Sequence, residues 1–262
     1  MRDGDQMSDL RAKSRQIDYY DHAVDDDFET NRPHGQSRLY TYLMDYKFNR
    51  VLGMVSSTLE GKSVLVICCG SGMDAEYLAR AGARVVALDI SPGAIKRAKV
   101  RAGRFAVEYE AVVGDAEHLD FPDGSFDYVF VHDGLHHLPE PEKALREMAR
   151  VAQHGIMITE PAQAALTRLL IRLGVMQPFE EAGNYVIRFS AAQLTNFALS
   201  AGFQRTRSAR YLVKYGHPPA GWWRAFDSQP LRGLAEAAFR MFGAGLFGPA
   251  GNKLAFVAER SI

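Results

Sequence analysis

Residues 63–72, SVLVICCGSG, decide the fold class of this chain. An apolar run that ends in a Gly-Ser-Gly turn is typical of a buried strand and the loop after it. Residues 74–81 then have the pattern of a helix, and Gly82 stands just past its end. Glycine at the turn lets the backbone approach a ligand closely, and the N-terminus of the helix offers free N–H groups. The stretch therefore predicts a strand, a ligand-facing turn and a helix.

The alternation of strands and helices continues beyond this unit. Further strands are expected at 84–88, 105–113, 126–131 and 155–159. One helix is expected to begin at Ser91-Pro92, because serine can cap a helix and proline fits its first turn. Another helix is expected at 141–152. Strands that are apolar throughout and separated by helices predict a parallel sheet covered on both faces.

The ends of four predicted strands carry chemically informative residues. Ligands of such sheets bind beyond the carboxyl ends of the strands. This rule brings together Gly70–Gly72, Asp89, Asp115 and His132. We therefore expect four separate strand ends to form one ligand site.

The remaining elements are expected before and after this core. A helix is predicted at 39–55, and an amphipathic, basic helix at 163–173. A helix at 191–201, a sixth strand at 203–213 and a last strand at 253–258 complete the chain.

Composition narrows the class of protein. The 262 residues are 47% hydrophobic and 24% charged, and these proportions exclude a disordered chain. The 31 basic and 31 acidic side chains balance, so the net charge does not indicate a strongly basic nucleic-acid binder. Two adjacent cysteines cannot form a disulfide framework and suit a reducing compartment. The first 16 residues are polar, and no apolar run reaches the roughly 18–20 residues that span a bilayer. We expect a soluble, cytoplasmic protein.

The glycine turn alone leaves two cofactor classes open. A dinucleotide fingerprint starting at Gly70 would have its third small residue at Ala75, so a nicotinamide oxidoreductase remains an alternative. Asp89 lies 17 residues after Gly72, and its carboxylate can accept bonds from ribose hydroxyls of an adenine dinucleotide or of an adenosyl ligand.

The motifs that follow are more specific. The stretches VLVICCGSGMDAEYLARAGARVVALDIS (64–91) and GDAEHLDFPDGSFDYVFVHDGLHHLPEPEKALREMARVA (114–152) resemble class I S-adenosylmethionine-dependent methyltransferases, especially the small-molecule group. The resemblance covers roughly residues 60–160. It implies a doubly wound α/β fold, a mostly parallel seven-stranded sheet of the Rossmann-like methyltransferase type whose last strand is antiparallel. It also implies S-adenosylmethionine as the cofactor.

The resemblance assigns part of the cofactor site to the first two strand ends. The backbone at Cys69, Gly70 and Gly72 is expected to face the methionine part of the cofactor. Asp89 is expected to bind both ribose hydroxyls, and Ile90 to pack on the adenine.

It assigns the rest of the cofactor site to the third and fourth strand ends and to the leading segment. Asp115 is expected to accept a bond from the adenine amino group, with the Ala116 backbone nearby. Val131 and His132 are expected to floor the site near the reactive methyl. Tyr20 is expected either to touch the cofactor or to serve in packing.

Three histidines near the fourth strand end are candidates for chemistry. His132 could take a proton from a substrate hydroxyl or amine, or could instead order the cofactor pocket. His136 and His137 resemble a metal or base pair, but in this family such a pair is common in the loop without catalytic duty. We therefore expect no metal.

Residues 180–189, EEAGNYVIRF, are interpreted as a substrate loop, with a structural lid as the equal alternative. Tyr185 and Arg188 are the expected substrate contacts there.

Two residues depart from the family pattern. The family often has an acid at the position of Val66 and a glycine at that of Cys68. These departures motivate an alternative function, a module that binds an adenosyl ligand without catalysis.

Residues 217–251 combine dense aromatic side chains with arginines at every eighth position, Arg224, Arg232 and Arg240. They are interpreted as a hairpin that contacts a membrane surface or covers an apolar substrate, or as a helical cap or dimer contact.

The chain as a whole is expected to have three parts: a helical cap at 1–58, the cofactor-binding core at 59–160, and substrate-side insertions with the last strands at 161–262. The expected activity is methyl transfer to an O, N or C nucleophile of a hydrophobic small molecule or lipid-like intermediate. No nucleic-acid partner is expected, because no Asn-Pro-Pro-Tyr type motif is present.

Overall fold

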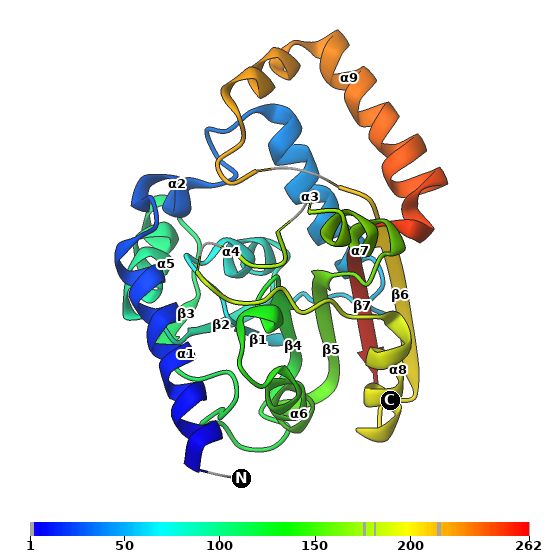
Figure 1. The fold of residues 1–262 in the computed structure, drawn as a ribbon. Helices are drawn as coiled ribbons and strands as arrows, with labels where there is room; N and C mark the ends of the chain where they lie inside the picture. Colours follow the sequence, from blue (N-terminus) through cyan, green and yellow to red (C-terminus); the bar gives the residue numbers. More distant parts are fainter. Residues whose placement is uncertain (1–2, 175–176, 181, 214–215, 262) are drawn as a thin grey trace.

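The computed structural model describes residues 3–174, 177–180, 182–213 and 216–261, and its centre is one seven-stranded sheet (Figure 1). The strands stand in the order β3-β2-β1-β4-β5-β7-β6. Their bounds are β1 Ser63–Ile67, β2 Arg84–Asp89, β3 Glu110–Val113, β4 Phe126–His132, β5 Ala152–Pro161, β6 Arg205–Tyr211 and β7 Lys253–Glu259. The first five strands pair in parallel, whereas β7 runs antiparallel to both β5 and β6. The expected doubly wound, mostly parallel sheet is confirmed.

Helices cover both faces of this sheet. They are α1 Asp3–His22, α2 Asp26–Asn31, α3 Arg38–Leu52, α4 Met73–Arg80, α5 Pro92–Arg104, α6 Pro141–Val151, α7 Ala165–Arg172, α8 Ala191–Ser200 and α9 Gln229–Ala238. Among the helices in the described ranges, none combines the length and the apolarity that a bilayer-spanning segment requires.

Strand β1 shows why the sheet needs two helical layers. Its side chains alternate between the faces, so Val64 and Val66 join one core cluster while Leu65 and Ile67 join the other. The first cluster includes side chains of α3, α4 and α5, and the second includes side chains of α6 and α8. All four β1 side chains are fully buried, as expected for a central strand apolar on both faces.

The third strand is shorter than the sequence pattern indicated. A strand was expected over 105–113, but α5 continues to Arg104 and β3 begins only at Glu110. Helix α5 extends to Arg104 because Arg101, in its last turn, is completely buried among hydrogen-bond acceptors. Phe105 then caps the helix, and Ala106 takes a positive φ of 49° that turns the chain toward the strand.

Glu76 on α4 is the acceptor at the centre of this buried polar cluster. Its carboxylate accepts from Arg101 Nε at 2.8 Å and from Arg80 Nε at 2.8 Å, and it contacts His34 Nε2 at 2.9 Å. Arg101 also donates to the Thr30 carbonyl at 2.9 Å, so the cluster joins α4, α5 and the last turn of α2. Burial lowers the pKa of Arg101, and the Glu76 carboxylate opposes that shift.

We expect the substitution Glu76→Ala to destabilise the fold by about 3–5 kcal/mol, because it leaves the Arg101 guanidinium buried without its counterion. Urea unfolding followed by circular dichroism measures this change. Glu142→Ala is the matched control, since Glu142 is exposed and lies 3.9 Å from Arg146. A loss below about 1 kcal/mol for Glu76→Ala would mean that the cluster is not a structural anchor.

The segment after β6 forms a helical arm over α3 (Figure 1). It consists of the 3-10 helix η2 (Gly221–Asp227), α9, the π-helix η3 (Phe239–Leu246) and the 3-10 helix η4 (Gly248–Ala250). Phe239 packs edge-on against Tyr46 of α3, with ring centroids 4.8 Å apart. Other large apolar side chains stay exposed, among them Trp222 at 66% and Leu234 at 68%. The arm is thus a helical cap on α3, and contact with a membrane or a second subunit stays a prediction.

Candidate functional site

The turn after β1 contains two glycines: Gly72 is closely surrounded by other atoms, whereas Gly70 has open space beside it. Gly72 has a φ of +80°, and a Cβ there would lie 2.4 Å from Tyr109 Oη and 3.0 Å from the Cβ of Ala98. Gly70 has a φ of +51°, but a Cβ there would meet nothing within 4 Å. Gly72 therefore allows α4 and α5 to pack closely, while Gly70 faces open space in which a ligand can reach the backbone.

Asp89 at the end of β2 is oriented by two backbone donors. Gly70 N donates to Asp89 Oδ2 at 2.9 Å, and Ser91 N donates to Asp89 Oδ1 at 2.9 Å. Burial raises the pKa of Asp89, and these two N–H groups oppose the shift. Each carboxylate oxygen keeps a second lone pair, so the side chain can accept two further bonds, as a pair of vicinal hydroxyls requires. The open Gly70 and this carboxylate together fit the ribose and amino-acid parts of an adenosyl ligand.

Cys68 stands where the family often has glycine, and its backbone conformation there costs energy for a residue with a side chain. It takes a φ of +52°, a left-handed conformation that favours glycine. Its neighbour Cys69 is buried, and its backbone N–H donates to the Leu88 carbonyl at 3.0 Å. Burial raises the pKa of both thiols, so neither has the thiolate character that cysteine chemistry requires.

Helix α1 lies along this edge of the sheet and contacts one expected cofactor residue, Asp115, together with neighbours of that site. Lys13 Nζ lies 2.6 Å from Asp115 Oδ2 and 2.5 Å from a carboxylate oxygen of Glu117. Asp21 accepts from the hydroxyl of Ser91 at 2.5 Å. The expected adenine acceptor, Asp115, is thus engaged by Lys13 in this arrangement. The sequence pattern carried no signal for that ion pair.

The side chain of Tyr20 faces the loop after β4. Its Oη lies 3.4 Å from Nε2 of His137, and the two rings meet edge to face with centroids 5.9 Å apart. Burial raises the pKa of the Tyr20 hydroxyl, and the nearby Glu180 carboxylate adds to that shift. Tyr20 therefore lies at the same edge of the sheet as the other expected cofactor residues, as a neutral phenol.

His132 closes β4 and is held by an acid on α4. Its Nδ1 lies 3.0 Å from Asp74 Oδ1, and both side chains are buried. Its Nε2 is also buried, lies 3.4 Å from Asp133 Oδ2 and makes no hydrogen bond within the described residues. An imidazole fixed at one nitrogen and unsatisfied at the other can exchange a proton with a ligand hydroxyl. The preceding Val131 is fully buried in the core cluster on the opposite face of the sheet.

Two lysines from distant elements meet at Asp133. Lys47 of α3 lies 2.8 Å from Oδ2, and Lys253 at the start of β7 lies 2.5 Å from Oδ1. Burial opposes ionisation of Asp133, but Lys253 and Lys47 hold its pKa well below the usual range. The carboxylate thus ties α3 and β7 to the end of β4, beside His132.

The loop after β4 carries a polar cluster around His136. Its Nδ1 lies 2.7 Å from Oε2 of the fully buried Glu160, and Oε1 of Glu160 accepts from the backbone of Gly134 at 2.8 Å and of Leu135 at 2.7 Å. Burial opposes protonation of His136, but the Glu160 carboxylate raises its pKa to about 9.

His137 and Glu180 complete the cluster. His137 Nδ1 lies 3.2 Å from Oδ1 of Asn184, and the two Nε2 atoms of His136 and His137 each lie 3.3 Å from a carboxylate oxygen of Glu180. Burial and the adjacent His136 lower the pKa of His137 to about 4. Although burial opposes it, the bond to His136 lowers the pKa of Glu180 to about 2. These side chains could hold a metal ion.

The expected substrate contacts on the loop at 180–189, Tyr185 and Arg188, make side-chain contacts with residues of their own segment. Tyr185 is 55% exposed, and its ring packs on Phe179 of the same loop with centroids 5.6 Å apart. Arg188 donates to the Val186 carbonyl at 2.9 Å, and burial lowers its pKa. Both roles stay predictions. Glu181, part of the same stretch, lies outside the described residues.

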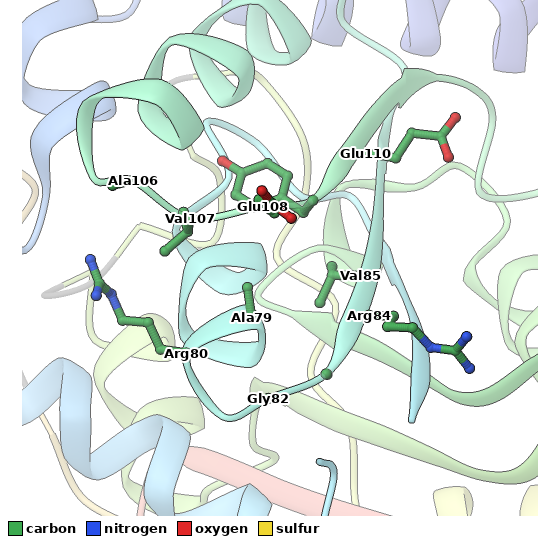
Figure 2. Close-up of a pocket in the computed structure, with 11 residues that line it drawn as sticks. Ala79, Arg80, Gly82, Arg84, Val85, Ala106, Val107, Glu108 and Glu110 are labelled. Atoms are coloured by element: carbon green, nitrogen blue, oxygen red, sulfur yellow. The ribbon is translucent and has the colours of Figure 1, made fainter. Parts of the chain in front are cut away.

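A broad depression of about 1090 Å³ lies at the opposite edge of the sheet (Figure 2). It is lined by the end of α4, the start of β2 and the turn after α5, with Arg80, Arg84 and Glu110 at its rim. Since Asp89 lies at the other end of β2, this depression is separate from the candidate site.

The sequence pattern missed the partners that other elements supply. Asp74, Lys47 and Lys253 carried no motif of their own, because their roles arise only when α4, α3 and β7 pack on the end of β4. Glu180 and Asn184 did belong to a stretch singled out for its polar residues among apolar ones. Their approach to the histidine pair follows from the course of the loop.

Comparison with known proteins is consistent with this geometry. A family model described as a methyltransferase domain matches residues 65–159. The chain is 38% identical over 109 residues to a demethylmenaquinone methyltransferase of Renibacterium salmoninarum, covering 42% of this chain and 44% of that one. It is 31% identical over 164 residues to a ubiquinone biosynthesis O-methyltransferase of Ralstonia nicotianae, covering 58% of this chain and 68% of that one.

Solved structures share the fold at low identity. Magnesium protoporphyrin IX methyltransferase from Synechocystis, solved with bound S-adenosylhomocysteine, aligns with a TM-score of 0.64 and 18% identity. The alignment covers 95% of this chain and all of that one.

In the sequence comparison, by contrast, the chain spans less than half the length of the demethylmenaquinone methyltransferases that it matches.

The sheet order, the glycine turn and the acid at the end of β2 define a Rossmann-like methyltransferase fold. The chain belongs to the class I S-adenosylmethionine-dependent methyltransferases. The family expected from the sequence motifs is therefore confirmed, and S-adenosylmethionine is the cofactor of that class.

Proposed function

We propose that this protein transfers the methyl group of S-adenosylmethionine to a nucleophile on a hydrophobic, quinone-like small molecule or lipid-like intermediate. The observation that carries the proposal is the Asp89 carboxylate, held by Gly70 and Ser91 beside the open turn. An acid fixed in this way is suited to two ribose hydroxyls, and it lies at the carboxyl edge of the parallel strands, where ligands of such sheets bind.

The residues at the end of β4 would act on the acceptor. When bound, the cofactor supplies a methyl group on a reactive sulfonium, so the protein needs chiefly to align the nucleophile and to exclude water. We propose His132 as the base that takes the proton of an acceptor hydroxyl at Nε2, which makes no hydrogen bond within the described residues. Asp74 holds Nδ1 of His132 and stabilises the imidazolium that forms. Lys47 and Lys253 hold Asp133 in its ionised form beside it.

Two features support an apolar acceptor. The face of α3 that precedes Lys47 presents Tyr46 and Tyr42 to Phe239 of the helical arm, and several apolar side chains of the arm are exposed. Curated relatives carry names that refer to demethylmenaquinone and to ubiquinone biosynthesis. A ring with an ionisable hydroxyl and an apolar tail meets both requirements.

A transfer assay with methyl-labelled cofactor tests the proposal. The acceptor panel pairs a catechol and a naphthoquinol that carry isoprenoid tails with the same rings lacking the tails. We expect labelled product and S-adenosylhomocysteine from the tailed acceptors, at least about tenfold faster than from the tailless ones. Equal turnover of both would overturn the apolar part of the proposal. Cofactor binding without turnover of any acceptor would favour the non-catalytic alternative.

A further inference from the structure

The loop after β4 and the loop after α7 place three metal-ligating side chains together. His136 and His137 lie in the 3-10 helix η1 (Leu135–His137), and Glu180 comes from a segment more than forty residues later. Their ligating atoms all lie within 4.8 Å of one another. None of the three is needed for the methyl-transfer steps proposed above.

The Glu180 carboxylate lies at ligand spacing from both imidazoles, with one oxygen facing each of them. His136 Nε2 lies 3.3 Å from Glu180 Oε1, and His137 Nε2 lies 3.3 Å from Glu180 Oε2. In a tetrahedral zinc site with bonds of about 2.0–2.1 Å, neighbouring ligand atoms lie about 3.3–3.4 Å apart. These two separations therefore suit an ion between the carboxylate and each imidazole, and all the ligand atoms lie within 4.8 Å of one another.

Both imidazoles are oriented by acceptors on their far side. His136 Nδ1 faces the buried Glu160 carboxylate at 2.7 Å, and His137 Nδ1 faces Asn184 Oδ1 at 3.2 Å. The orientation of the Asn184 amide is fixed independently, because its Nδ2 donates to the His136 carbonyl at 3.2 Å. Metal-binding histidines almost always donate their other N–H to a carboxylate or a carbonyl oxygen in this way.

When His137 donates from Nδ1 to Asn184, the lone pair on its Nε2 faces another hydrogen-bond acceptor. With its proton on Nδ1, toward Asn184, neutral His137 directs Nε2 toward a Glu180 oxygen 3.3 Å away, so two electron-rich atoms face each other. The Tyr20 hydroxyl, 3.4 Å from Nε2, is the donor that the structure places there. A cation between Nε2 and the carboxylate would replace that repulsion with two attractive contacts.

A second candidate group, Asp133, His136 and Glu160, is less suitable. Asp133 is already neutralised by Lys47 and Lys253, and Glu160 is held by the backbone of the loop.

We propose that His136, His137 and Glu180 form a binding site for one divalent cation of the zinc class. Two imidazoles and one carboxylate are ligands that zinc accepts readily, whereas magnesium prefers an all-oxygen shell. Three protein ligands leave a fourth position for water or another oxygen ligand. Sequence reasoning expected no metal here, because such a histidine pair is common in this loop of the family without catalytic duty. The third ligand, Glu180, is brought to the pair only by the fold.

Zinc binding by the full chain tests this site. The protein is stripped with a chelator, dialysed against Zn²⁺ alone and analysed for metal, and its affinity is measured against a chromophoric chelator. We expect one zinc per chain and no comparable binding of Mg²⁺. Glu180→Gln and His137→Ala are each expected to lower zinc affinity by at least about 100-fold. Asn184 orients His137 without binding the metal, and loss of such a partner lowers metal affinity roughly 10–100-fold. Asn184→Ala should therefore lower zinc affinity by a factor in that range.

Matched controls separate this site from adventitious binding. His22→Ala removes an exposed histidine of α1, and Glu142→Gln removes an exposed acid of α6, so both should bind zinc as the parent does. Circular dichroism in chelator checks that each variant folds. Less than half an equivalent of zinc in the parent, or unchanged affinity in Glu180→Gln and His137→Ala, would overturn the proposal. The readout is bound metal, so it does not depend on whether an acceptor has been found.

Discussion

Asp89→Ala is expected to weaken binding of S-adenosylmethionine and S-adenosylhomocysteine by at least about 100-fold. The Asp89 carboxylate offers one free acceptor position on each oxygen, and a hydrogen bond to a charged group contributes about 1.5–3 kcal/mol. Losing two such bonds would therefore lower the affinity by two orders of magnitude or more. Isothermal titration calorimetry with both adenosyl ligands measures the change.

The control for Asp89→Ala is a nearby exposed acid. Asp120→Ala should bind both ligands as the parent does, because Asp120 is exposed and lies beyond the end of β3. NADH should bind neither the parent nor the variants. Since Asp89 also joins the turns after β1 and β2, thermal unfolding without ligand must show that Asp89→Ala is folded. A folded Asp89→Ala protein with parental affinity would contradict the assigned ribose contact.

His132→Gln is expected to lower kcat by about 10²–10⁴-fold while leaving the affinity for S-adenosylmethionine nearly unchanged. A positioned general base contributes about that factor, and glutamine can keep a bond to Asp74 but cannot accept a proton. Single-turnover kinetics with an accepted substrate measures the chemical step, and calorimetry measures the cofactor affinity.

His22→Gln is the matched control, because His22 is exposed at the end of α1 and lies 3.4 Å from Asp18 rather than at the end of β4. It should retain the parental kcat. If His132→Gln also retains it, His132 is not the base, and its bond to Asp74 would then serve to position β4 against α4. If cofactor affinity falls together with kcat, His132 orders the cofactor pocket instead.

The sheet was predictable from the sequence because its strands are short apolar runs between turn residues. The run ending at the glycine turn, and Ser91 before Pro92, gave the positions of β1 and the start of α5. Phe105 was misleading: an aromatic residue before alternating residues indicated a strand, but the burial of Arg101 extends the helix to that point. Local pattern could not show this, because the acceptors of Arg101 lie on other elements.

The cofactor residues could be predicted only as far as they lie on strand ends. Asp89 and Gly70 follow from the fold rule, and the structure brings them into contact. Asp115 does lie at the end of β3, but its partner Lys13 comes from a helix about a hundred residues away in sequence. The same holds for His132, whose partner Asp74 is 58 positions distant. Long-range polar contacts of this kind leave no periodic signal in one sequence.

The position of β6 at one end of the strand order has a consequence for solubility. Among the strands of the described ranges, β6 pairs with β7 alone, so the other side of β6 is a template on which a further strand could add. Arg205 is an exposed, charged side chain of this strand, whereas Arg207 is paired with Glu259 of β7 at 2.7 Å. Charges on an edge strand oppose edge-to-edge pairing between copies, since two such edges would juxtapose like charges. We therefore expect Arg205 to oppose association of two copies through this edge.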